Sequence, residues 1–495
     1  MTSATDSFAR TSSTCRSVFN WLSTRRREVG LIAIFAFLLV VFFYTFLLVV
    51  FTDTRPIGHL NTGDSNNLVS GTRVALDCLR AGHVFDCGPS VGPYPLLQYL
   101  PSAVLVELGL SDDQILGVLG TISFLAVLLL LLATLAVFRT RPKVATLLIL
   151  MLLPTSLMYQ STSAFGEALT ASLVGAAVLA AISRRPLLLF ALVVAASLGK
   201  ETLAPFVVLL ALVCARSASD GLLPSRKLTI AAAGGGLAGI AICLAFNVFR
   251  FGTVRNVAYL DPILRTPGVG RKAEFFAGIV ASPAAGVVWY WPVLALVTSF
   301  GAARGIRQLT QRPHDLRNGL PVLSVLGVML GWFALLSLWF APFGWEAYGP
   351  RLAVPVLVGG AVAIAHVAGE SVIEFIARRR LALAAVGSSL AVGCIQFGAP
   401  WRWSNSMAQL FGTPTGPCSE SPVAVHPAVD ADLYYRCVSE MMWRRSPLVV
   451  DEVIDFSASV AGSAWLLAVA GSFMLLWFVG SGNELHGLPG GHSEI

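Results

Sequence analysis

One aspartate stands where its carboxylate could act as a catalytic base. Asp64 lies within Leu60–Asn67 (LNTGDSNN), a run of small and polar residues that follows the first long hydrophobic segment. Small neighbours leave a carboxylate within reach of a ligand, which favours a catalytic role. The same composition is also typical of an ordinary turn. Either interpretation places the stretch in the first sizeable polar loop, and the rest of the chain has to decide between them.

Three more charged residues interrupt apolar runs. Glu167 follows Phe165-Gly166, and Lys200-Glu201 breaks an otherwise hydrophobic segment. A charge within a membrane segment is costly unless it is paired or solvated, and such residues commonly mark functional sites. Two interpretations therefore stay open: these residues bind a ligand, or Lys200 pairs with a carboxylate and only joins neighbouring helices.

The composition shows which elements must position these residues. Of 495 residues, 56% are hydrophobic and only 12% are charged, so polar surface is too scarce to cover a soluble protein. Several runs reach the roughly 20 apolar residues that a spanning helix needs; they include Leu31–Phe51, Gln114–Phe138, Thr229–Phe249 and Val460–Gly480. We therefore expect an all-α polytopic membrane protein with about twelve transmembrane segments.

The basic residues predict the orientation. Arg25-Arg26-Arg27 immediately precede the first span, which indicates a cytoplasmic N-terminus. Alternating the loops from there leaves both termini cytoplasmic, with disordered tails at 1–28 and 481–495 and a membrane-embedded domain over 29–480. The net charge of +7 then reflects topology, and we expect no nucleic acid partner. The predicted location is the cell membrane, as a multi-pass protein.

Two short helical hairpins are expected at about 144–182 and 187–215. Basic residues flank them, and each arm is shorter than a full span. Their tips, at 159–167 and 199–201, should therefore lie below the outer membrane surface, where irregular polar backbone is tolerated only if it is buried in protein or lines a wet cavity.

The outer loops are predicted at about 52–113, 250–283, 342–350 and 401–458. Periodic apolar positions in the first loop and the run at 272–280 predict helices that rest in the membrane interface. Four cysteines, Cys78, Cys87, Cys418 and Cys437, fall in the two largest loops as two local pairs. Disulfides within each pair suit an oxidising exterior, although the sequence leaves other pairings and free thiols open. We expect the last loop to form a lid. The chain has no Cys/His spacing typical of a metal site.

The order of several short motifs resembles a known family. They are Gly63-Asp64 in the first outer loop, Tyr94-Pro95, the short hairpins, Asn247-x-x-Arg-Phe-Gly, Ser282-Pro283 followed by Trp289-Tyr-x-Pro, and Tyr348-Gly-Pro-Arg-x-x-x-Pro. Over residues 29–370 this order is similar to the GT-C superfamily of polytopic glycosyltransferases, in the dolichyl-phosphate-mannose transferase-like group.

The resemblance implies an inverting sugar transfer from a polyprenyl-phosphate donor at the outer face. A first-loop carboxylate would deprotonate the acceptor hydroxyl, and Asp64 occupies that position; Asp53 and Asp77 are reserve candidates. The acceptor would be a glycan, glycolipid or protein of the cell envelope, next to membrane lipid. Asp-Ser stands where the family often has an acidic pair, so no metal is predicted and no cofactor is required, although a divalent ion is compatible with the chemistry.

This chemistry also needs cations near the donor phosphate. Arg351 is the first candidate, because a guanidinium matches phosphate oxygens in a bidentate fashion; a snorkelling interfacial arginine is the alternative. Lys200 is the second candidate, and Arg250 or Arg255 the third. The remaining candidates for the acceptor cavity are Glu167, Glu201, Tyr94, Glu346 and Tyr348.

Two other functions fit the sequence. A transporter or flippase for a lipid-linked sugar would share the membrane topology, but we find no inverted internal repeat. A catalytically inactive relative that assists an assembly is the other alternative. The sugar and the acceptor are not determined by the sequence.

Overall fold

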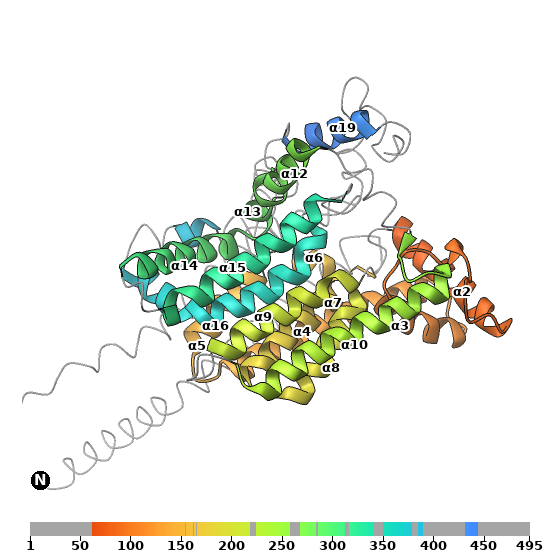
Figure 1. The fold of residues 1–495 in the computed structure, drawn as a ribbon, viewed down its shortest axis with the longest axis horizontal. Helices are drawn as coiled ribbons and strands as arrows, with labels where there is room; N and C mark the ends of the chain where they lie inside the picture. Colours follow the sequence, from red (N-terminus) through yellow and green to blue (C-terminus); the bar gives the residue numbers. More distant parts are fainter. Residues whose placement is uncertain are drawn as a thin grey trace, which may run out of the picture.

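The computed structural model describes a bundle of helices (Figure 1). The described residues are 62–153, 155–161, 163–164, 166–217, 224–257, 268–283, 286–311, 316–339, 350–378, 385–389 and 431–443. Within these ranges the elements are helical and none is a β-strand. The all-α prediction is therefore confirmed for this part of the chain, whereas both predicted tails lie outside it.

Four described helices are long and apolar enough to cross a membrane. They are Asp112–Val137 (α4), Arg226–Phe251 (α10), Gly319–Ser337 within α15 (Leu316–Ser337), and Arg351–Ile376, which covers η3 (Arg351–Ala353) and most of α16 (Val354–Arg378). A membrane protein is thus supported. The first and last predicted spans lie outside the described residues, so a total of about twelve remains a prediction, as does the orientation.

Both short hairpins are present. The first consists of α5 (Pro142–Leu152), the one-and-a-half-turn α6 (Ser156–Ser161) and α7 (Glu167–Ile182). The second consists of α8 (Pro186–Gly199), η2 (Glu201–Leu203) and α9 (Ala204–Ser217). Helices α7, α8 and α9 have 16, 14 and 14 residues, each short of the roughly 20 residues of a full span.

Small residues let the central helices approach closely. Helix α16 packs against α7, and 89% of its apolar window is buried. A side chain added at Gly359 would meet Val174 of α7, and one added at Gly175 would meet Val358 of α16. Such small-residue contacts are typical of helix pairs in membranes, where packing rather than the hydrophobic effect drives association.

A second layer covers one end of the bundle. It contains α2 (Thr62–Arg80), η1 (Pro89–Val91) and α3 (Leu96–Glu107), which pack through a cluster of apolar residues around Tyr99. The Leu60–Asn67 prediction needs correction here, because the chain is helical from Thr62 instead of forming a loop. Its polar residues form the first turn of an amphipathic helix, where short polar side chains and an acidic residue are favourable.

A projecting part carries α12 (Val269–Ala281) and α19 (Ala431–Trp443), as Figure 1 shows. Their contact buries Phe275 against Tyr434 and Tyr435, and Arg271 Nη1 donates to Ser439 Oγ over 2.8 Å. Helices α13 (Val287–Tyr290) and α14 (Pro292–Gln311) lead back into the bundle. The helix predicted at 272–280 is thus present as α12, and a helix also lies within 401–458; their places in the membrane interface and on the outer side stay predictions.

Candidate functional site

The basic residues of the chain reversals and the candidate site residues lie at opposite ends of the bundle, because successive helices run in alternating directions. Ten basic residues lie at the chain reversals between α4 and α5, α7 and α8, and α9 and α10, or near the end of α14: Arg139, Arg141, Lys143, Arg184, Arg185, Arg216, Arg226, Lys227, Arg304 and Arg307. We call this the basic end. The other end, here the site end, holds the first residue of α7, the last residues of α8 and α10, and the turn that heads α16.

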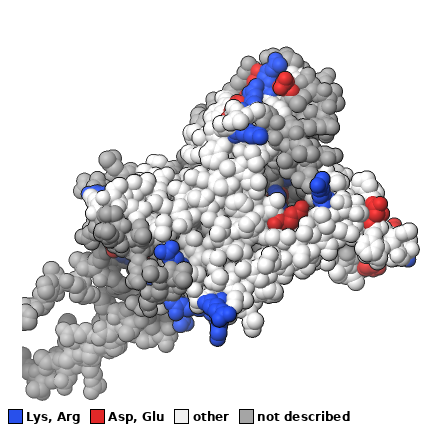
Figure 2. Space-filling model, in the orientation of Figure 1, with Lys and Arg blue, Asp and Glu red and all other residues white. Residues whose placement is uncertain are grey.

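The surface between these ends is almost uncharged. Figure 2 shows a broad middle with few charged side chains, basic residues at its lower left edge, acidic residues toward its right edge, and both kinds on the projecting part at the top. Acidic and basic atoms also lie close together where the projecting part meets the bundle. This distribution matches a protein whose uncharged belt faces hydrocarbon.

Glu167 and Arg351 form a buried ion pair at the site end. Arg351 Nε lies 3.2 Å from Glu167 Oε1, and the two side chains are only 5% and 10% exposed. Glu167 is the first residue of α7, where the helix dipole favours a negative charge. Arg351 lies in η3, immediately before α16. The pair therefore joins the starts of two central helices that pack against each other.

Lys200 lies close enough to interact with this pair. It links α8 to η2 and interacts electrostatically with Glu167, Arg351 and Glu201. Its Nζ lies over the indole of Trp332, 6.0 Å from the ring centroid. Two cations and two carboxylates thus gather where the starts of α7, η2 and η3 meet, and the positive ends of helices add to the positive potential there.

Close backbone contacts fix the two hairpin tips. A side chain added at Gly199 would overlap Thr170 of α7, so the end of α8 touches the first turns of α7. Gly166 has a φ of 81°, in the left-handed region that favours glycine, and a side chain there would overlap Gln98 of α3. The α3 layer therefore borders the residue that precedes Glu167.

Arg250 ties the end of α10 to the chain before α3. Its Nη1 donates to the carbonyls of Gly92 (3.0 Å) and Tyr94 (2.6 Å), and its Nη2 donates to Asn247 Oδ1 (2.5 Å). These contacts give Arg250 a structural role, and its phosphate binding stays a prediction. Arg255 lies beyond Gly252 and is exposed.

Tyr94 is buried in the apolar cluster of the α2–α3 layer, with its ring centroid 6.4 Å from that of Tyr99. The Tyr99 hydroxyl donates to the carbonyl of Val91. Burial raises the pKa of Tyr99 to about 12, so the hydroxyl keeps its proton near neutral pH. This bond holds η1 against α3 and leaves the carbonyls of residues 92 and 94 facing Arg250.

The backbone of Asp64 lies in the first turn of α2. The structure describes the side chains of this helix from Asn67 onward. Gly71 of α2 abuts Val91, and Arg80 pairs with Glu107 at the end of α3 over 2.7 Å. These contacts show that α2 runs in the same direction as α3. The turn that contains Asp64 therefore lies toward the start of α3, where Gln98 meets the tip before Glu167.

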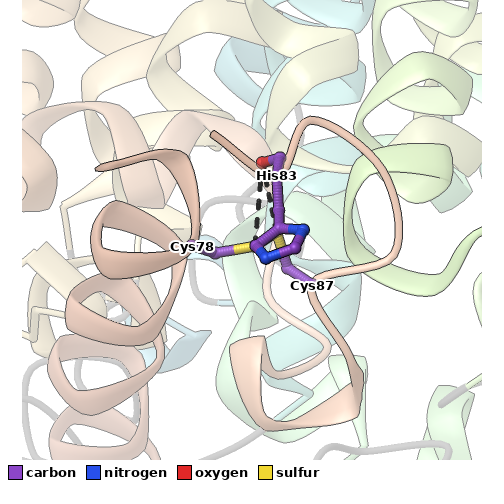
Figure 3. Close-up of a disulfide and its surroundings, with 3 residues drawn as sticks. All are labelled: Cys78, His83 and Cys87. Atoms are coloured by element: carbon purple, nitrogen blue, oxygen red, sulfur yellow. Dashed lines mark hydrogen bonds between the residues drawn. A yellow bond between two sulfur atoms is a disulfide. The ribbon is translucent and has the colours of Figure 1, made fainter. Parts of the chain in front are cut away.

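A disulfide closes the loop that follows α2. Cys78 and Cys87 are bonded, with a Cα–Cα distance of 5.8 Å, and the His83 carbonyl lies beside them (Figure 3). Backbone N–H groups of Asp86 and Cys87 donate to Val248 and Phe249 at the end of α10. The first predicted disulfide is thus confirmed. Cys437 is also disulfide-bonded, and its predicted partner Cys418 lies outside the described residues.

The structure therefore brings Glu167, Lys200, Glu201 and Arg351 together. Glu346, Tyr348 and the reserve candidate Asp53 lie outside the described residues, and the other reserve, Asp77, pairs with Arg80 on the exposed face of α2. Sequence reasoning missed Trp332, because a tryptophan in an apolar run looks like any membrane anchor. Across the described ranges no group of three His, Cys, Asp or Glu residues could hold a metal ion.

Comparison with known proteins adds no assignment: no protein-family model, curated protein or solved structure matches the chain.

Proposed function

We propose that the protein is an integral membrane glycosyltransferase that moves a sugar from a polyprenyl-phosphate donor to an acceptor hydroxyl, with inversion at the anomeric carbon. The acceptor oxygen attacks that carbon and gives its proton to Asp64. The bond between the anomeric carbon and the phosphate oxygen breaks, and polyprenyl phosphate leaves with the bonding electrons. A cell-envelope glycan or glycolipid acceptor and an outward-facing site belong to the same proposal.

The convergence of Lys200 and Arg351 beside Glu167 carries this proposal. A departing lipid phosphate needs fixed positive charge, and preorganised cations in a poorly solvated site stabilise developing negative charge strongly. Arg351 is held by a carboxylate through Nε, which orients its planar guanidinium. Lys200 adds a point charge from another hairpin.

The layer of α2 and α3 supports Asp64 as the base. It covers the site end, and its first helical turns lie toward the hairpin tips. A base on one element and cations on others would let the acceptor and the donor approach from different sides. Glu167 and Glu201 would hold the cations, and positioned proton transfer typically contributes a rate factor of about 10² to 10⁴.

A direct assay tests the proposal. Purified full-length protein is incubated in nanodiscs with a panel of polyprenyl-phosphate sugars and a cell-envelope extract as acceptor. We expect one donor to be consumed with release of polyprenyl phosphate, and an Asp64→Ala variant of the same thermal stability to release none. Turnover by Asp64→Ala at the wild-type rate would refute the assignment of the base.

One observation also suits a transporter of lipid-linked sugars. The short helices α8 and α9 reverse direction at Lys200, beside buried charge, and transporters also form binding sites at the ends of short membrane helices. Proteoliposomes distinguish the two functions. Movement of an intact lipid-linked sugar between leaflets, without cleavage of its glycosidic bond, would favour transport.

A further inference from the structure

The Trp332 side chain contacts both cation-bearing segments of the site. Its Nε1 donates to the carbonyl of Leu352 over 3.1 Å, and Leu352 follows Arg351 within η3. The face of the same indole lies under Lys200 Nζ, 6.0 Å from the ring centroid. One side chain of α15 therefore bonds to the turn that carries Arg351 and lies beneath the ammonium group of Lys200.

The indole itself is firmly held. Trp332 is fully buried, and Phe206 of α9 packs edge-on against it with ring centroids 5.0 Å apart. Phe206 lies in the first turn of α9, just beyond Lys200 and η2. The ring orientation is thus set by the hairpin that carries Lys200, while its N–H group is directed at η3.

We propose that Trp332 is a positioning residue that sets the spacing between Lys200 and Arg351 and so matches the two cations to one phosphate group. This inference rests on the proposed function, because it assigns the pair a phosphate ligand. An ammonium over an indole face is attracted by the ring electrons, and the hydrogen bond to Leu352 keeps η3 at a fixed distance from that face. Neither contact requires Trp332 to touch the ligand.

Binding of two matched lipids separates positioning from general packing. A short-chain polyprenyl phosphate and the corresponding polyprenol differ only in the phosphate, so the ratio of their dissociation constants reports the contribution of the cations. The ratio is measured by calorimetry on full-length protein in nanodiscs. A merely structural role for Trp332 would change both dissociation constants together and leave the ratio unchanged.

Two variants and a matched control complete the design. Trp332→Phe keeps a ring face for Lys200 but loses the N–H group, and Trp332→Leu loses both. Trp291→Phe is the control, because Trp291 is equally buried and its Nε1 donates to Ser156 Oγ over 2.9 Å instead of to η3. Thermal unfolding checks that each variant is folded, and Trp332→Phe keeps the test usable if Trp332→Leu does not fold.

We expect the phosphate preference to fall about threefold to tenfold in Trp332→Phe, further in Trp332→Leu, and not at all in Trp291→Phe. Combined with Lys200→Met, the Trp332 effect should be less than additive, since both changes disturb one interaction. An unchanged ratio in both Trp332 variants, or full additivity with Lys200→Met, would overturn the inference and leave the proposed function intact. A wild-type protein that binds both lipids equally would overturn the proposed function together with this inference.

Discussion

Arg351 and Glu167 meet through Nε and Oε1 at 3.2 Å, although one residue heads α16 and the other begins α7. The contact joins the two helices at the end of the bundle that also receives Lys200. Because this ion pair is buried, it links the two helices and also holds the Arg351 guanidinium in a fixed orientation. The following predictions test these two roles and the elements around them.

Removing one charge of this pair should be costly. Glu167→Gln keeps the side-chain shape but leaves the buried Arg351 charge without this carboxylate, and we expect the free energy of unfolding to fall by about 3 kcal/mol. The double variant Glu167→Gln/Arg351→Met should recover much of that loss. Denaturant unfolding in detergent micelles measures both. Arg73→Met, in the half-exposed Arg73–Asp112 pair, is the control and should change stability by about 1 kcal/mol or less. Additive losses in the double variant would contradict a direct coupling.

The two aspartates of α2 should differ in their effect on turnover. We expect Asp64→Ala to lower kcat by about 10² to 10⁴ because the acceptor hydroxyl loses its base. Asp77→Ala, on the same helix and paired only with exposed Arg80, should leave kcat unchanged. Steady-state release of polyprenyl phosphate is the measurement. The reverse pattern would move the base to Asp77.

Arg250 is expected to act on structure. Arg250→Gln removes donors to the carbonyls of Gly92 and Tyr94, so the backbone amides at positions 91, 92, 94 and 96 should exchange hydrogen faster, and the thermal midpoint should fall. Arg255→Gln, at an exposed position in the bend after α10, should change neither. Hydrogen exchange with mass spectrometry reads the local effect. Protection unchanged in Arg250→Gln would show that these carbonyl contacts do not hold the segment.

The disulfide of the first loop should stabilise a local region. Replacing both Cys78 and Cys87 by Ser is expected to cost about 2 to 3 kcal/mol, by the chain-entropy estimate for a short loop. Exchange should quicken at residues 81–88 and at the last turn of α10, since Asp86 and Cys87 donate to that turn. Cys214→Ser, in a buried free thiol of α9, controls for loss of a cysteine without loss of a bond. Serines are preferable to a reductant, which would also reduce the disulfide of Cys437.

Gly199 should tolerate no side chain. Gly199→Ala places a methyl group against Thr170, which should separate the hairpin tips and lower the thermal midpoint. Thr170→Ala in the same protein should restore part of the loss by removing the atoms in the way. Gly327→Ala is the matched control in α15, where an added methyl group meets nothing, and it should be neutral or slightly stabilising. Equal midpoints for all three variants would show that the tips do not need this contact.

Much of the architecture follows from the sequence alone. Runs of apolar residues require helices, because a membrane leaves backbone groups no other partners. The shortness of α7, α8 and α9 follows from the basic residues and polar breaks that bound them, and Glu167 and Lys200 identify the tips because charge in such runs demands compensation. The stretch at Leu60–Asn67 misled because residues that favour turns also favour the first turn of a helix, and only the apolar positions after it distinguish the two.

The partners of these charges were decided by tertiary structure. The sequence shows that Glu167, Lys200, Arg250 and Arg351 each need compensation, but the energy of an ion pair or hydrogen bond depends on distances between segments far apart in the chain. Helix packing places Arg351 next to Glu167 and Arg250 next to two backbone carbonyls. It also places Lys200 over the face of Trp332. The sequence therefore determined that a polar site must exist at one end of the bundle, and the fold determined which residues compose it.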